Sequence, residues 1–143
     1  MAAERLVVDT WGWLSLADDR EPRHRHVRQV VAELGRAAGT AVTTDYILDE
    51  TLTLVFRRLP FARARRFMAT LDTAEQDGSV SIEAIGAERF ASAKTLRLRF
   101  RDKPDISFTD LTTMVVMHEC RLTRILTADE HFRHVGMGFH LLP

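Results

Sequence analysis

The chain has 143 residues, 45% of them apolar and 28% charged, which is enough to bury the core of one domain over residues 1–143. Its 20 basic and 20 acidic residues balance, so its overall charge predicts neither a nucleic-acid binder nor a membrane-surface binder. No apolar run approaches the ~20 residues of a membrane helix, and no signal peptide is recognised. We therefore expect a cytoplasmic protein that does not engage a membrane.

Predicted strands and helices alternate from the start of the chain. Residues 5–9 (RLVVD) are apolar and end abruptly at a carboxylate, which predicts a short buried strand. A helix is expected over residues 10–17. Apolar residues at helical spacing predict a second helix over 24–39, with Gly39 as its C-terminal stop. Residues 40–44 (TAVTT) then predict a second strand.

The middle of the chain continues the alternation. Residues 45–59 carry apolar side chains along one side and predict a helix. Pro60 favours the start of another helix, over 61–76. Residues 78–85 (GSVSIEAI) predict a third strand, and 86–100 predict the helix that follows it.

A nearly continuous apolar segment marks the last third. Residues 107–122 predict a buried helix, because their central part is apolar on almost every side. Residues 124–127 predict a fourth strand, 128–136 a short helix, and 139–143 a possible fifth strand. Strands alternating with helices favour an α/β fold: a three-layer α/β/α sandwich around a mainly parallel central sheet of about four or five strands.

Four carboxylates recur where such a sheet would place functional groups. Asp9 ends the first strand and Asp129 follows the fourth, while Glu50 and Asp110 lie early in helices. In open α/β sheets, ligand-binding groups collect at the carboxyl ends of the strands. Like charges ~4 Å apart repel by roughly 4 kcal/mol at an effective dielectric of 20. Either some carboxyls stay protonated, or a cation such as Mg²⁺ or Mn²⁺ neutralises them.

A structural explanation competes for most of these acids. Asp9, Asp110 and Asp129 could each cap a helix N-terminus. Glu50 is harder to explain in this way, because it lies inside a helix beside an apolar face. Its charge needs a partner, or its side chain must reach the surface.

The residues around the four acids resemble the acidic motifs of a known family, the PIN domain. The matching segments keep the family's order over nearly the whole chain: LVVDT (6–10), TTDYILDE (43–50), SFTDLTTMVVMHE (107–119) and ILTADEHF (125–132). A chain of this size is similar to the VapC-like ribonuclease toxins of toxin–antitoxin pairs. The resemblance implies that Asp9, Glu50, Asp110 and Asp129 hold Mg²⁺ or Mn²⁺ and are catalytic. It further implies a metal-dependent endoribonuclease, the toxin of a type II system, that forms a homodimer and is masked by a small antitoxin.

Several neighbouring residues are candidates for supporting roles. Asp105 could be a fifth metal ligand, although a plain loop residue after Pro104 is the alternative. The hydroxyls of Thr10, Thr127 and Ser107 could orient carboxylates or water, and helix capping explains them nearly as well.

Arginine and histidine clusters are open to similar alternatives. Arg97 and Arg101 would share a helical face and could bind RNA backbone, but a solvated helix face is the default interpretation. His131 and His134 also have helical spacing, yet without cysteine pairs or a zinc-protease motif we expect surface histidines.

Two other functions remain open at this point. The chain could be a catalytically inactive PIN-like module for RNA binding or assembly, although such a module has no reason to keep mutually repelling carboxylates. It could also be a small-molecule phosphatase that uses the same metals on a phosphomonoester.

Overall fold

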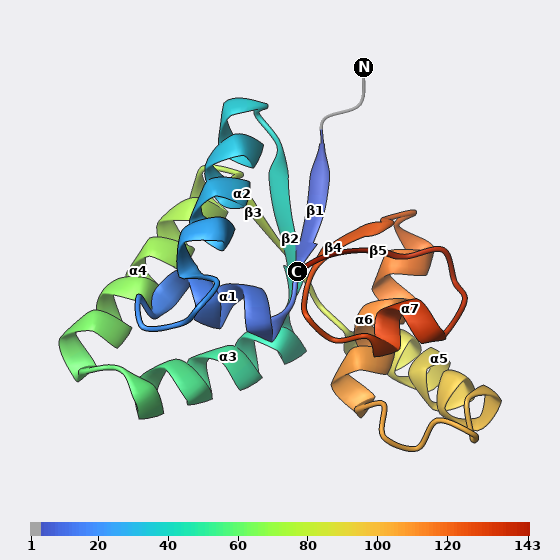
Figure 1. Cartoon of the computed structure of the whole chain (residues 1–143). Coiled ribbons are helices and arrows are strands. Elements are labelled where there is room, and N and C mark those ends of the chain that lie inside the picture. Colours follow the sequence, from blue (N-terminus) through green and yellow to red (C-terminus); the bar gives the residue numbers. More distant parts are fainter. Residues whose placement is uncertain (1–3) are drawn as a thin grey trace.

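The computed structural model describes residues 4–143, so the first three residues of the predicted domain lie outside the described part. A five-stranded sheet stands between two groups of helices (Figure 1). The strands are β1 (Arg5–Val8), β2 (Thr40–Thr44), β3 (Val80–Glu83), β4 (Arg124–Leu126) and β5 (His140–Leu142). The helices are α1 (Thr10–Ala17), α2 (His24–Arg36), α3 (Asp45–Arg58), α4 (Phe61–Gln76), α5 (Gly86–Arg99), α6 (Phe108–Glu119) and α7 (His131–His134).

The central strand β1 is buried on both faces, because its successive side chains point to opposite layers. Leu6 and Val8 belong to an apolar cluster with Trp13 of α1 and residues of α2 and α4. Val7 points the other way, into a cluster with Met114 of α6 and residues of α5 and α7. Figure 1 shows α1, α2 and α4 on one side of the sheet and α5, α6 and α7 on the other. The predicted three-layer α/β/α sandwich is confirmed.

The order in which the chain adds strands reverses beside β1. The sheet runs β3-β2-β1-β4-β5, and all of its strand pairs are parallel. The chain builds outward from β1 through β2 to β3, and then returns to add β4 on the opposite side of β1. This reversal is the topological switch point, beside which open α/β sheets bind ligands at the carboxyl ends of the strands. Here those ends are Val8 and Leu126, which are directly paired.

Helix α2 ends three residues earlier than the sequence predicts, so Gly39 is not its immediate stop. Arg36 is the last helical residue, and Ala38 adopts the left-handed conformation with φ of 52°. The Gly39 amide donates to the Leu34 carbonyl at 2.9 Å. Gly39 is needed there for close approach, because a Cβ atom would lie 2.8 Å from the Glu4 carbonyl oxygen.

Other boundaries differ where a turn intervenes. Strand β3 begins at Val80 rather than at residue 78, because Gly78 turns the chain with φ of 84°. Helix α6 ends at Glu119, and the left-handed Arg121 (φ 56°) follows it. The burial of α6 is as predicted, since every residue over 110–117 is buried. Within residues 4–143, no helix combines the length and the hydropathy needed to cross a membrane.

Candidate active site

Asp9 is the first residue after β1, at the carboxyl edge of the sheet. It occupies the N-cap position of α1, yet its side chain makes no capping hydrogen bond. Its Oδ2 atom accepts a hydrogen bond of 2.9 Å from the Thr127 hydroxyl, and the residue is only 6% exposed. Thr127 directly follows β4, so this bond joins the ends of the two strands at the switch point. Asp9 therefore stands at the cap position, but its side chain bonds across to Thr127 rather than capping the helix.

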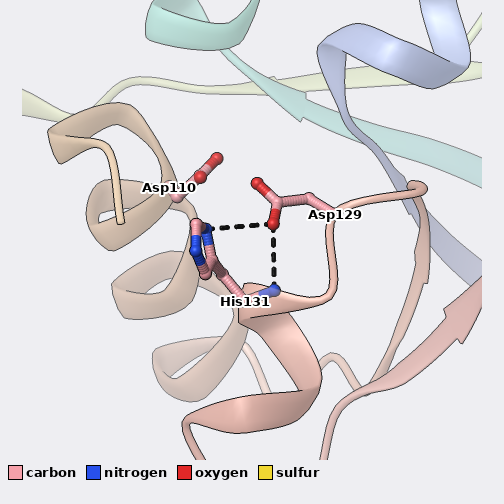
Figure 2. Close-up of side chains that lie close together, drawn as sticks. All are labelled: Asp110, Asp129 and His131. Carbon is pink, nitrogen blue, oxygen red and sulfur yellow. Dashed lines mark hydrogen bonds and ion pairs between the residues drawn. The ribbon is translucent and has the colours of Figure 1, made fainter. Parts of the chain in front are cut away.

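Asp110 enters the same region from α6. The cap of this helix is Ser107, whose Oγ atom accepts from the Asp110 amide at 3.0 Å. Capping therefore explains Ser107 and does not explain Asp110. The Asp110 carboxyl is left free of that task, buried in the first turn of the helix, and it faces Asp129 (Figure 2).

Asp129 completes the group from the loop between β4 and α7. Its amide donates to the Thr127 hydroxyl at 3.0 Å, and its Oδ1 atom accepts from the His131 amide at 2.9 Å. One carboxylate oxygen is thus used to start α7, as a capping residue would use it. The other oxygen points toward Asp110 (Figure 2).

The surroundings raise the pKa values of two of these carboxyls, Asp110 and Asp9. Burial, together with the charges of Asp9 and Asp129, raises the pKa of Asp110 from 3.8 to about 8. Burial also raises the pKa of Asp9 to about 6, and the charges of Asp129 and Glu50 add to this effect. The hydrogen bond from Thr127 opposes it, although it does not cancel it. Strongly perturbed carboxyls that lie close together are typical of functional sites.

Glu50 lies at the rim of this group rather than inside it. The residue is exposed on α3, so its side chain reaches the surface as its helical position requires. It lines a shallow hollow of about 500 Å³ together with Tyr46, Asp49 and Thr109, the residue before Asp110.

Two predicted supporting residues differ in their surroundings. Asp105 is exposed in the loop between α5 and α6, and its role as a ligand stays a prediction without support from the geometry. Thr10 is 8% exposed, and its hydroxyl has no hydrogen-bond partner among residues 4–143.

The arginine pair does not form the predicted face. Helix α5 ends at Arg99, so Arg101 lies beyond it. The prediction that Arg97 and Arg101 share a helical face is therefore wrong. The Arg97 guanidinium instead donates to backbone carbonyls that end α5 and shape the following loop. These acceptors are Phe100 at 2.8 Å, Lys103 at 2.6 Å and Ile106 at 2.7 Å.

Sequence reasoning missed His131, which it assigned to the surface. One atom each from Asp110, Asp129 and His131 can be chosen so that all three lie within 4.8 Å of one another. The imidazole lies beside both carboxylates, and its Nδ1 atom is 3.0 Å from Asp129 Oδ1 (Figure 2). Its position two residues after Asp129 was the available signal. His134 is exposed, as predicted.

This arrangement fits a divalent cation. Carboxylate oxygens are the ligands that Mg²⁺ and Mn²⁺ accept, and a cation would offset the burial and the like charges that raise the two pKa values. The unpartnered hydroxyl of Thr10, next to Asp9, marks a further polar group for which residues 4–143 provide no partner. The side chains gathered here therefore have the chemistry that a divalent-metal site requires.

Two solved structures with a similar fold are named VapC20 and VapBC2. VapC20 of Mycobacterium tuberculosis, described as a toxin that cleaves the sarcin–ricin loop, is 24% identical with a TM-score of 0.75; the alignment covers 92% of this chain and 95% of that one. VapBC2 of Rickettsia felis, bound to a DNA fragment from its promoter, is 14% identical with a TM-score of 0.66, covering 97% and 98%. No curated protein matches the sequence. The PIN domain family matches residues 6–137, which include all four predicted acids, and the chain therefore belongs to the PIN domain family.

Proposed function

We propose that this protein is a divalent-metal-dependent endoribonuclease that acts in the cytoplasm as the toxin of a type II toxin–antitoxin system. The observation that carries the proposal is the group of Asp9, Asp110 and Asp129 at the switch point of a PIN domain. Two of these carboxyls have pKa values raised to about 6 and about 8. The fold shared with VapC20, described as a toxin that cleaves the sarcin–ricin loop, supports RNA as the substrate.

Some residues of the site orient the carboxylates, and others would bind the metal. The Thr127 hydroxyl fixes one oxygen of Asp9, and the His131 amide fixes one oxygen of Asp129. Asp9, Asp110 and Asp129 would hold Mg²⁺ or Mn²⁺, with Glu50 contributing from the exposed rim. A metal held by these residues would supply the activation of a water and the stabilisation of the leaving oxygen of the phosphodiester. The open hollow beside Glu50 leaves room for the RNA backbone to approach.

Replacing one carboxylate tests the proposal. Asp9→Asn keeps the size of the side chain and removes its charge, so we expect RNA cleavage with Mg²⁺ or Mn²⁺ to fall at least about 100-fold. An RNA hairpin that contains the sarcin–ricin sequence is a reasonable first substrate. Asp72→Asn, an exposed change on α4, is the control and should retain full activity. Circular dichroism should show both variants folded, and a fully active Asp9→Asn would refute the assignment.

The same assay separates the two alternatives. An inactive binding module would retain RNA with a measurable affinity and never cleave it, with or without metal. A phosphatase would hydrolyse a generic phosphomonoester and leave the hairpin intact. Metal-dependent cleavage of the hairpin by the wild type, abolished by EDTA, excludes both.

We propose that the antitoxin binds an apolar groove between α1, α2 and α4. The groove has a volume of about 800 Å³; Asp77 lines it, and none of the four predicted metal-binding acids does. Its apolar floor and walls include Trp13, Leu16, Val31 and Phe67, while Arg63 and Arg66 of α4 also line it. An amphipathic segment with apolar anchors and flanking acidic residues complements such a surface.

A matched pair of variants on α4 tests this surface. Thr70 and Thr73 are both exposed, but only Thr70 lines the groove. In cells that express the toxin, co-expression of the protein encoded beside this gene should restore growth. We expect it to fail to do so for Thr70→Arg and to succeed for Thr73→Arg. Rescue of both variants would contradict the groove as the binding site.

We also propose that the protein forms a homodimer. Leu98 on α5 is 77% exposed, more than the other large apolar side chains that lie on the surface of residues 4–143. Pairing of two copies would bury such surface. Leu98→Glu should therefore shift the protein from dimer to monomer in light scattering, while a wild type that is monomeric at micromolar concentration would contradict pairing.

A further inference from the structure

His131 lies against the acidic residues of the site. It is the first residue of α7, and its backbone amide donates to Asp129 Oδ1 at 2.9 Å. This bond brings the side chain back over the same carboxylate. Figure 2 shows the imidazole next to Asp110 and joined by a dashed line to Asp129.

The Nδ1 atom of this ring is buried and makes no hydrogen bond with any residue over 4–143. It lies 3.0 Å from Asp129 Oδ1, but the contact lacks the angles of a hydrogen bond, and the atom is inaccessible to solvent. A buried ring nitrogen of this kind needs an explanation, because most buried polar atoms are paired. The ring nitrogen of His131 lies close to the oxygens of Asp110 and Asp129 without a hydrogen bond to them. Ligands that surround one shared ion have this arrangement.

We propose that His131 is a nitrogen ligand of the divalent cation, together with Asp110 and Asp129, and that it makes the site prefer Mn²⁺ to Mg²⁺. Mg²⁺ favours oxygen ligands and gives up its bound water reluctantly, whereas imidazole suits transition-metal ions. The inference rests on the proposed function in one respect: the acidic residues must bind a divalent cation. It goes further by assigning a ligand and a metal preference.

Electron spin echo spectroscopy of bound Mn²⁺ tests the ligand directly. A coordinated imidazole nitrogen modulates the Mn²⁺ echo, and carboxylate and water ligands do not. We expect this nitrogen modulation in the wild-type protein loaded with Mn²⁺, and its loss in His131→Gln. His134→Gln, an exposed change in the same short helix, is the matched control and should keep the modulation.

Competition between the two metals tests the preference. We expect His131→Gln to lose about 10-fold or more of its affinity for Mn²⁺, in the range known for residues that support a metal site, while its affinity for Mg²⁺ changes little. Equal losses for both metals would overturn the proposed preference. The melting temperature without metal shows whether the variant is folded, and the spectrum of the wild type tests the ligand without any variant.

The two proposals can fail separately. If the wild type binds Mn²⁺ and cleaves RNA but shows no nitrogen modulation, the assignment of His131 is overturned and the ribonuclease remains. If Mn²⁺ does not bind at millimolar concentration, the His131 assignment is overturned as well, and cleavage assays with Mg²⁺ then decide on the ribonuclease.

Discussion

At the scale of single residues, the carboxyl of Asp110 carries a cost to the fold that can be measured. Its pKa is raised from 3.8 to about 8 by burial and by Asp9 and Asp129. Between these values the folded state holds a proton that the unfolded state releases, so the free energy of unfolding falls as the pH rises. Asp110→Asn removes this penalty. Without metal, we expect the variant to be more stable by about 1–3 kcal/mol at pH 8, since each pKa unit corresponds to about 1.4 kcal/mol.

Thermal unfolding in EDTA measures this effect. The gain should be several degrees at pH 8 and should vanish near pH 4, where the carboxyl is protonated in both states. Asp72→Asn, an exposed change, should show no gain at either pH. A less stable Asp110→Asn at pH 8 would mean that the carboxyl has a structural task and not a functional one.

Arg97 differs from Asp110, because the charge of Arg97 stabilises the fold. Its guanidinium donates to the carbonyls of Phe100, Lys103 and Ile106 at 2.6–2.8 Å. Hydrogen bonds from a charged donor contribute about 1.5–3 kcal/mol, and carbonyls that lose a donor add a desolvation penalty. We therefore expect Arg97→Gln to lower the free energy of unfolding by about 2 kcal/mol in urea titrations.

The neighbouring arginine provides the control. Arg101 is exposed beyond the end of α5, so Arg101→Gln should change stability by less than about 0.5 kcal/mol. Equal effects of the two substitutions would show that the loop does not depend on the guanidinium of Arg97.

Local pattern could place Asp9 and Asp129 at strand ends, because a buried strand followed by a carboxylate is visible in the sequence. It could not place His131 or Arg97. The surroundings of both side chains depend on contacts formed only after folding: the Asp110 carboxylate, far before His131 in the chain, and a loop that folds back on α5. Exposed helix positions and functional ones look alike until the tertiary neighbours are known.

At the scale of elements, α1 depends on a glycine for its position. Gly12 is buried one turn after Asp9, and a Cβ atom there would lie 2.9 Å from Val8 Cγ1 and 3.0 Å from the Leu126 carbonyl oxygen. Alanine normally stabilises a helix relative to glycine by about 0.5–1 kcal/mol. Here the overlap with backbone should reverse the sign, and we expect Gly12→Ala to destabilise the protein by about 1–3 kcal/mol.

A second helical glycine isolates this effect. Gly35 lies in α2, where a Cβ atom would have no described neighbour within 4 Å, so Gly35→Ala should stabilise by about 0.5–1 kcal/mol. Denaturant unfolding of both variants compares the same chemical change in two environments. Stabilisation by Gly12→Ala would mean that α1 can move away from β4, and Asp9 would then lack a fixed position.

The alternation of strands and helices could be predicted because it depends on periodicity within each segment. The ends of segments were less predictable. Helix α2 stops at Arg36 because the chain must then pass the Glu4 carbonyl at Gly39, a contact with a residue far away in sequence. Helix α7 is shorter than predicted, because the carboxylate of Asp129 accepts the amide of His131 and starts the helix there.

At the scale of the whole molecule, folding and metal binding should respond to pH in opposite directions. Asp9 and Asp110, with pKa values raised to about 6 and about 8, make the metal-free protein less stable as the pH rises from about 4 to about 8. The pKa values of Asp18, Asp77 and Asp102 are lowered by hydrogen bonds. Their stabilisation is present above about pH 4 and is lost in more acidic solution, so it leaves the slope above pH 4 unchanged.

A bound cation should remove this slope, since metal ligands bind in their ionised form and the affinity therefore rises with pH. At about 100 times its dissociation constant, Mn²⁺ stabilises a folded protein by about 2.7 kcal/mol. We expect little increase in melting temperature at pH 5 and a rise of several degrees at pH 8, measured against EDTA at pH 5, 6.5 and 8. Asp110→Asn should flatten both curves. If the wild-type curves are flat and coincide with and without Mn²⁺, the carboxylates at the switch point do not form a metal site, and the nuclease proposal loses its foundation.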